Sequence, residues 1–242
     1  MTLQFPKRIA EPKLMGAIEM ESFNQLSKSN YKRWMLPLVD GFLEIYKIRR
    51  GQILDVACGP GLLSKELAIR LPQATVTGID YSKHAINLAK QNCQGLANSQ
   101  FRQMDAYRIQ FSSAKFDAVV CKDSLHHFNK PTQALKEMLR VLKPGGLLYL
   151  QDMRRDLPGY LLKLAMPPDT VTKQLQYYST RAAYTKSEIA NVLKKMGIKN
   201  FNIKTKIFNR TAKLKYQKLG IEPRALIAGA QSRFTLTITK PS

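Results

Sequence analysis

The chain has 242 residues, of which 44% are hydrophobic and 23% are charged, so it is long and apolar enough to bury a substantial core. Its three cysteines are odd in number and far apart, which argues against a disulfide framework and for a reducing compartment. No apolar segment resembles a secretory signal or approaches the ~18 residues that span a bilayer. We therefore expect a cytoplasmic protein without a transmembrane segment.

The net charge of +22 is concentrated in the last third of the chain. Residues 151–242 contain eighteen lysines and arginines against five acidic residues, and residues 194–218 contain nine basic residues and no acid. Such a stretch is either a binding surface for a polyanion or an anionic membrane, or an ordinary solvated surface. The sequence leaves both interpretations open.

Residues 1–50 are predicted to be helical, with apolar residues at three- and four-residue spacing and a second helix that starts near Pro37. Short apolar segments then alternate with amphipathic ones. This alternation predicts a mostly parallel sheet with helices on both faces. The expected strands are 53–57, 74–79, 99–104, 116–121 and 147–153, and the expected helices are 62–71, 83–93 and 132–142, the last ended by Lys143, Pro144, Gly145 and Gly146.

The alternation stops after the fifth strand. Residues 154–184 have the pattern of a helical insertion, and Thr185 heads a capping box that introduces a helix over 188–196. Residues 200–208 and 233–240 alternate between apolar and polar side chains, which predicts two closing strands. We expect these strands to be antiparallel neighbours at one edge of the sheet.

A glycine turn follows the first strand in the segment ILDVACGPGLLSKELA, residues 53–68. Asp55 lies near the end of the strand, and Gly59 and Gly61 allow the backbone to come close to a ligand. A dinucleotide-binding fingerprint would contain a third glycine, which is missing here. A carboxylate is also a poor neighbour for a pyrophosphate but a good one for an ammonium or sulfonium group.

Acidic residues also stand at the ends of the next two strands. Asp80 comes nineteen residues after Gly61, where an acid at the tip of the second strand binds the ribose hydroxyls of an adenosine. Asp105 ends the third strand, and the segment CKDSLHHF, residues 121–128, follows the fourth. Because ligands bind outside the carboxyl ends of such strands, this edge fits an adenosine with a positively charged amino-acid tail.

These motifs resemble those of the class I S-adenosylmethionine-dependent methyltransferase family and occur in that family's order within residues 50–152. The resemblance implies an α/β fold, with a Rossmann-like seven-stranded sheet that is mostly parallel, has an antiparallel last strand and carries helices on both faces. It also implies S-adenosylmethionine as cofactor, S-adenosylhomocysteine as product and no metal. The matching segments are DVACGPG (55–61), GIDYS (78–82), QMDA (103–106), FDAVVCKDSLHHF (116–128) and LKPGGLLYL (142–150).

The resemblance divides the chain into an N-terminal helical lid (1–50), a cofactor-binding core (51–152), a helical cap over the substrate (153–185) and a closing part of the same domain (186–242). The closing part contains the last helix and the two antiparallel strands.

The resemblance also assigns nine residues to the cofactor, with alanine at position 57, where the family often has glycine. Simpler alternatives are that Asp80 caps a helix, that Asp105 is a plain turn acid and that Cys121 is a small buried residue. The implied contacts are Asp55 for the methionine amino group; Ala57, Gly59 and Gly61 for the turn under methionine and ribose; Asp80 for the ribose; Tyr81, Asp105 and Ala106 for adenine; and Cys121 for the methionine tail.

His126 and His127 are the candidate general bases, with His126 slightly favoured, because histidine titrates near neutral pH. The alternative is that one packs in the core and the other only shapes the pocket. The segment after the fourth strand lacks the Asn/Asp-Pro-Pro-aromatic turn of enzymes that methylate nucleobase amines. The LHHF form instead resembles methyltransferases that act on small molecules, including those of quinone and natural-product pathways.

The leading hypothesis is methyl transfer to an O, N or C atom of a small molecule. One alternative is an RNA or ribosomal methyltransferase that uses the basic stretch. A second is a non-catalytic scaffold that binds S-adenosylmethionine. Substrate residues are expected outside the shared core, where Arg181 could bind a carboxylate or phosphate, or could cap a helix. The candidates for substrate contact are Tyr31, Trp34, Tyr178, Arg181 and Tyr184.

Overall fold

The structure is a computed structural model that describes residues 7–9, 16–157, 178–206 and 208–241. The chain divides into two compact units, each assembled from segments far apart in the sequence. Most of the predicted substrate cap, residues 158–177, lies outside the described residues. The core unit comprises Met15–Lys122, Lys130–Leu150 and Thr237–Ser242, and the C-terminal unit comprises Met1–Leu14, Asp123–Asn129 and Gln151–Leu236.

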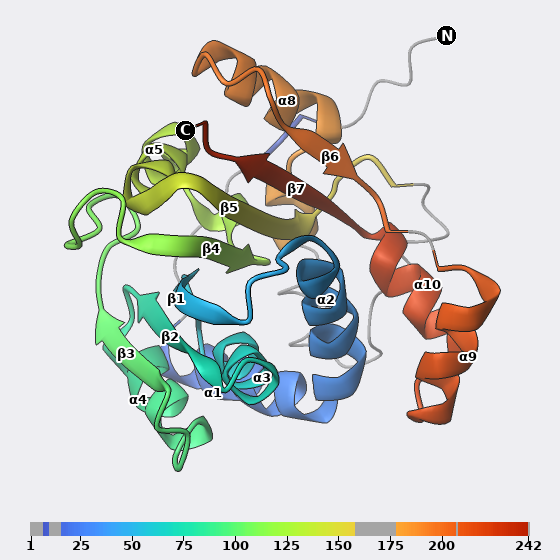
Figure 1. Cartoon of the computed structure of the whole chain (residues 1–242). Coiled ribbons are helices and arrows are strands. Elements are labelled where there is room, and N and C mark those ends of the chain that lie inside the picture. Colours follow the sequence, from blue (N-terminus) through green and yellow to red (C-terminus); the bar gives the residue numbers. More distant parts are fainter. Residues whose placement is uncertain (1–6, 10–15, 158–177, 207, 242) are drawn as a thin grey trace, which may run out of the picture. The chain divides into compact units, whose positions relative to one another are not determined.

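Seven strands form one sheet in the order β3-β2-β1-β4-β5-β7-β6 (Figure 1). β1 pairs in parallel with β2 and β4, and β2 pairs in parallel with β3. β7 is antiparallel to β5, because backbone hydrogen bonds join Lys240 to Gly146 at one end and Arg154 to Ser232 at the other. This confirms the predicted sheet. The strands are β1 (Arg50–Val56), β2 (Gln73–Asp80), β3 (Ser99–Gln103), β4 (Phe116–Lys122), β5 (Leu142–Met153), β6 (Asn202–Lys204) and β7 (Arg233–Thr239).

Several of the helices begin at side chains that cap them. The Ser82 hydroxyl accepts a hydrogen bond from the Ala85 N–H, and Thr185 and Glu188 form the predicted capping box. The helices are α1 (Ala17–Ser29), α2 (Tyr31–Ile45), α3 (Leu62–Arg70), α4 (Lys83–Asn92), α5 (Pro131–Val141), α8 (Lys186–Lys195), α9 (Arg210–Lys218) and α10 (Pro223–Gln231), with a 3₁₀ turn η1 (Leu125–His127).

The prediction that a helix starts near Pro37 is wrong, because Pro37 lies inside α2. A proline in this position removes one hydrogen bond of the helix. The apolar face of α2 outweighs that loss, since Leu38 and Phe42 are almost fully buried in one cluster with Ile53 of β1. Tertiary packing therefore decides where this helix begins.

The predicted separation between α5 and the fifth strand is also wrong. β5 begins at Leu142, directly after α5, so the Lys143–Gly146 segment belongs to the strand. Its extension is explained by pairing with the end of β7, where the Gly145 N–H donates to the Lys240 carbonyl over 2.9 Å.

The first closing strand, predicted over residues 200–208, is shorter than predicted, because β6 ends at Lys204. Two helices that were not predicted follow it. Asn209 caps α9 and Glu222 caps α10, each by accepting a hydrogen bond from a backbone N–H. Phe208 and Tyr216 are buried and pack edge to face with ring centroids 5.5 Å apart. The basic stretch thus runs through the end of α8, β6 and α9.

Candidate active site

The turn between β1 and α3, residues 57–61, is called the glycine turn below. Ala57, Gly59 and Gly61 all have positive φ angles, of 55°, 52° and 75°. A Cβ atom on Gly61 would lie 2.7 Å from the Cβ of Ala89, so this glycine is required for packing against α4. A Cβ on Gly59 would have only Phe23 near it, at 4.0 Å. Gly59 is therefore the position where the turn faces open space.

Asp55 lies behind the glycine turn with an exposed fraction of 1%. Its Oδ2 accepts a hydrogen bond from the Ser64 hydroxyl over 2.6 Å. Burial raises the pKa of Asp55 from 3.8 to about 7, and the Asp80 charge adds to this, although Ser64 and Lys122 act in the opposite direction. A carboxyl group that ionises near neutral pH would be held ionised by a nearby cation.

Asp80 joins the tip of β2 to the glycine turn. Its Oδ2 accepts a hydrogen bond from the Gly59 N–H and its Oδ1 accepts one from the Ser82 N–H, both over 2.9 Å. Ser82 itself is the N-cap of α4, so helix capping does not account for Asp80. The turn is further fixed by the Cys58 N–H, which donates to the Ile79 carbonyl over 2.9 Å.

The other residues assigned to the cofactor differ in their exposure. Tyr81 is 63% exposed, whereas Cys121 is buried. Asp105 is exposed, and its Oδ1 accepts a hydrogen bond from the Tyr107 N–H over 2.8 Å, as in a local turn. Its neighbour Ala106 is half-buried. All of these residues belong to the core unit.

Two of the predicted substrate residues, Tyr31 and Trp34, pack against the apolar cluster of the core unit. The Tyr31 hydroxyl donates to Oε2 of Glu66 over 2.6 Å, and burial together with this partner raises the pKa of Tyr31. The Nζ atom of Lys122 lies 5.5 Å from the ring centroid of Trp34, within range of a cation–π contact. Sequence analysis did not identify Ser64, Glu66 or Lys122.

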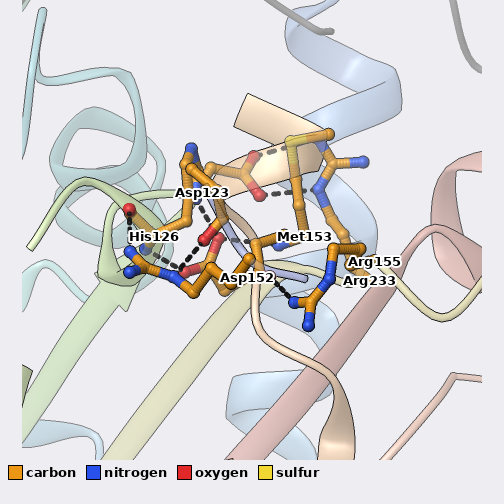
Figure 2. A network of polar contacts seen from close by, with 9 residues as sticks. Asp123, His126, Asp152, Met153, Arg155 and Arg233 are labelled. Atoms are coloured by element: carbon orange, nitrogen blue, oxygen red, sulfur yellow. Dashed lines mark hydrogen bonds and ion pairs between the residues drawn. The ribbon is translucent and has the colours of Figure 1, made fainter. Parts of the chain in front are cut away.

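The turn after β4, residues 124–128, is called the histidine turn below, and it belongs to the C-terminal unit. His126 has an exposed fraction of 2% and its Nδ1 lies 2.5 Å from Oδ1 of Asp152 (Figure 2). The backbone N–H groups of His126 and Met153 also donate to Asp152, over 2.8 and 2.7 Å. An ionised carboxylate can only accept, which places a hydrogen on Nδ1 of His126.

His127 is the more accessible of the two histidines, because it is half-buried whereas His126 is enclosed. The two rings lie against each other with centroids 4.1 Å apart. The slight preference for His126 as the base rested on its position after the fourth strand, which does not reveal burial. The ring of His127 is therefore more open to solvent than that of His126.

Asp123 and Arg233 anchor the start of the histidine turn (Figure 2). Asp123 has a φ angle of 47°, and its carboxylate accepts two hydrogen bonds from the Arg233 guanidinium, over 2.7 and 3.0 Å. Burial lowers the pKa of Arg233, but the charges of Asp123 and Asp152 outweigh it and raise the pKa overall. A forked ion pair of this kind holds a turn firmly.

The remaining predicted substrate residues lie on a segment of the C-terminal unit that contacts the N-terminal arm, residues 7–9. The guanidinium of Arg8 lies 4.3 Å from the ring centroid of Tyr184, and the Ile9 N–H donates to the Arg181 carbonyl over 3.1 Å. Tyr178 is 46% exposed. Sequence analysis did not identify Arg8, Asp152 or Arg233, although the end of the fifth strand was a signal for Asp152.

Residues 7–9, 16–157, 178–206 and 208–241 contain no group of three or more His, Cys, Asp or Glu side chains arranged to hold a metal ion. In the same ranges no helix has the length and apolar character needed to cross a bilayer.

A family model described as "Methyltransferase domain" (Methyltransf_31) matches residues 49–215, which is more than half of the chain. The chain belongs to this methyltransferase domain family. The matched part includes both the glycine turn and the histidine turn, so the family assignment covers the two centres described above.

Similar curated proteins match over a shorter part. The chain is 41% identical over 100 residues to a demethylmenaquinone methyltransferase of Deinococcus radiodurans, covering 41% of this chain and 42% of that protein. It is 34% identical over 110 residues to a ubiquinone biosynthesis O-methyltransferase of Coxiella burnetii, covering 45% and 46%. The chain thus spans less than half the length of these two relatives.

Solved structures match over nearly the whole chain at lower identity. The plantazolicin methyltransferase BpumL, in complex with a triazolic desmethylPZN analog and SAH, has a TM-score of 0.70, 19% identity and coverage of 93% of this chain and 91% of its own. The structure of a "putative S-adenosyl-L-methionine-dependent methyltransferase" of Methanococcus maripaludis has a TM-score of 0.69, 19% identity and coverage of 97% of this chain and 98% of its own. These similarities establish the methyltransferase fold.

Proposed function

We propose that this methyltransferase-family protein binds S-adenosylmethionine at the glycine turn and transfers the methyl group to a small-molecule acceptor. The observation that carries the proposal is the pairing of Asp55 and Asp80 with the turn that bears Gly59. One carboxyl group lies buried behind the turn, the other ties the tip of β2 to it, and Gly59 faces open space. The family assignment supports the same reaction.

The two acids have different roles in this proposal. Asp55 holds the cationic amino-acid end of the cofactor, because a positive group lowers the free energy of its ionised form. Asp80 holds the ribose hydroxyls, since its position at the tip of β2 is where such an acid binds a ribose. Tyr81, Asp105 and Ala106 would contact the adenine, and Cys121 would lie near the methionine tail. None of the described side chains is assigned to a metal.

The cofactor supplies a methyl carbon that is already activated by its sulfonium, and that is the whole of its chemical contribution. The chain aligns the acceptor atom with that carbon and excludes water, and alignment alone supplies roughly 7–11 kcal/mol of catalysis. An acceptor hydroxyl must also lose a proton. We assign that step to Nε2 or Nδ1 of His127, the half-buried imidazole, and assign His126 to support through its ring contact.

The acceptor is proposed to be a small molecule with a hydroxyl or activated carbon, such as a demethylated quinone. This is supported by the names of the relatives from Deinococcus radiodurans and Coxiella burnetii. Tyr178, Arg181 and Tyr184 of the C-terminal unit and Tyr31 and Trp34 of the core unit remain proposed contacts. We also place the protein in the cytoplasm. This is supported by its three cysteines, which are buried free thiols, as is usual in a reducing compartment.

An RNA acceptor is less well supported. Of the three aromatic residues of the basic stretch that could stack on bases, Phe208 and Tyr216 are buried and pack on each other, which leaves only the half-buried Phe201. The cations are spread over the end of α8, β6 and α9, and Figure 1 shows α8 and α9 at opposite ends of β6. We expect RNA binding that is weak and disappears at physiological salt.

The proposal is tested in two steps. Calorimetry with S-adenosylhomocysteine should show binding to one site. Transfer of a labelled methyl group should then be followed into RNA, protein and small-molecule fractions of a cell extract, and into a demethylated hydroquinone. Label in the small-molecule fraction is expected. Binding without transfer to any fraction would instead indicate a scaffold, and label in RNA would indicate the RNA methyltransferase.

A further inference from the structure

We infer that Arg8, in the N-terminal arm, is a positioning residue that fixes the orientation of the His127 ring. The inference deepens the proposed function, because it rests on His127 as the proposed base. It concerns only the C-terminal unit, which contains residues 7–9, the histidine turn and the 181–184 segment.

Arg8 connects three segments that are far apart in the sequence. Its Nη2 donates to the His126 carbonyl over 2.9 Å, and its Nε donates to the Ala182 carbonyl over 2.6 Å. Its guanidinium also lies over the ring of Tyr184 at 4.3 Å. A planar guanidinium can make two such bonds and a stacking contact at once, whereas a lysine ammonium cannot reproduce that arrangement.

The carbonyl that Arg8 binds belongs to the peptide that joins His126 to His127. The other polar end of this peptide, the His127 N–H, donates to the Ser124 carbonyl over 3.1 Å. With both ends bonded, the peptide plane is fixed, and the plane sets the direction in which the His127 side chain leaves the backbone. Arg8 is thereby a contact from outside the histidine turn that holds the peptide between His126 and His127.

The preceding peptide is held independently. The His126 N–H donates to Oδ2 of Asp152, and the His126 ring contacts Oδ1 of the same carboxylate. Asp152 therefore fixes His126, and Arg8 fixes the peptide between His126 and His127. The ring centroids of the two histidines lie 4.1 Å apart. A change in the orientation of that peptide therefore alters the direction in which the His127 ring faces an acceptor. Displacement of a catalytic group by about 1 Å can cost 10²-fold in rate.

The test uses the imidazole NMR signals of the 242-residue chain, which has three histidines. Signals are assigned with His84→Gln and His127→Gln. His84 on α4 belongs to the core unit and serves as an internal reference. Arg8→Lys and Arg8→Ala are expected to shift the His127 signals and leave those of His84 in place. The control is Lys7→Gln, which removes the exposed charge next to Arg8 and should leave all three histidines unchanged.

Methylguanidinium added to Arg8→Ala should return the His127 signals toward their wild-type positions, while methylammonium at equal concentration should not. Unchanged His127 signals in a folded Arg8→Lys protein would overturn the inference, whether or not the protein is an enzyme. If Arg8→Ala does not fold, Arg8→Lys alone decides between these outcomes.

Once an acceptor is known, the kinetic expectation can be measured. Arg8→Lys should lower kcat about 10–10²-fold and leave the affinity for S-adenosylhomocysteine within about twofold. A wild-type kcat in Arg8→Lys, or an equal loss of cofactor affinity, would contradict the positioning role. Absence of methyl transfer by the wild-type protein would instead count against the proposed function, and the NMR result would still stand.

Discussion

The glycine turn of the core unit and the histidine turn of the C-terminal unit are both short loops that follow strands, but they are held in different ways. The glycine turn is held mainly by backbone geometry and by one acid, Asp80, from the neighbouring strand. The histidine turn is held by side chains from three distant places, namely Arg8, Asp152 and Arg233. Local sequence therefore specifies the first turn, and tertiary structure specifies the second.

The largest expected effect tests whether Asp80 serves the ligand as well as the turn. Asp80→Ala should weaken S-adenosylhomocysteine binding by about 10²–10⁴-fold, because it removes two charge-assisted hydrogen bonds of about 1.5–3 kcal/mol each. Calorimetry measures the affinity, and circular dichroism checks the fold. Asp117→Ala is the matched control, since Asp117 also accepts a backbone N–H in the core unit, that of Gln52. Equal affinity in a folded Asp80→Ala protein would remove Asp80 from the site.

The next effect concerns the stability of the histidine turn. Asp152→Ala should lower the free energy of unfolding by about 3–5 kcal/mol, because it leaves the buried N–H and ring of His126 and the half-buried N–H of Met153 without their acceptor. Asp105→Ala, at an exposed strand end, should change it by less than about 0.5 kcal/mol. Urea unfolding measures both. A similar small change in the two variants would show that the His126–Asp152 pair does not hold the turn.

Two glycine substitutions separate packing from ligand access within the glycine turn. Gly61→Ala should destabilise the protein by about 2–4 kcal/mol, because the new Cβ would overlap Ala89 and alanine is strained at this φ. Gly59→Ala should cost only about 1 kcal/mol, since space surrounds it, but should weaken cofactor binding. Thermal unfolding and calorimetry give the two quantities. The reverse order of destabilisation would be inconsistent with the described turn.

The smallest expected effect is a pH dependence from Asp55. Its pKa in the folded protein is raised from 3.8 to about 7, so its contribution to stability is full below pH 3.8 and is lost as the pH rises through about 7. A bound cation holds it ionised, so cofactor affinity should increase about tenfold between pH 6 and 8, with release of up to one proton. Calorimetry in buffers of different ionisation enthalpy measures the proton. Asp55→Asn should abolish the pH dependence, and a dependence that persists would assign it to another group.

The contrast between the turns explains what could be predicted from the sequence. The sheet, the carboxyl ends of its first five strands and the positions of Asp55, Asp80 and the glycines depend on local patterns of the sequence, and these predictions agree with the fold. The roles of the assigned cofactor and substrate residues stay predictions. The start of α2 at Pro37 was predicted wrongly, because packing of its apolar face overrides the cost of an internal proline.

The partners of the histidine turn could not be predicted in the same way. Arg8 and His126 are 118 positions apart, and Asp123 and Arg233 are 110 apart, so no local pattern connects them. Burial likewise depends on the assembled unit, which is why the sequence did not distinguish the enclosed His126 from the half-buried His127. The helices α9 and α10 had capping signals at Asn209 and Glu222 that were not recognised from the sequence.

The buried thiols at the glycine turn give the protein an internal reporter of local opening. The Cys58 Sγ–H donates to the Gly59 carbonyl, and the Cys93 Sγ–H donates to the Gly61 carbonyl over 3.5 Å. Burial raises the pKa of both thiols, that of Cys93 to about 12, so alkylating reagents meet almost no thiolate in the closed turn. The rate at which an alkylating reagent labels Cys58 therefore measures how often the turn opens, and occupation of the turn by a cofactor should slow that rate without any engineered label.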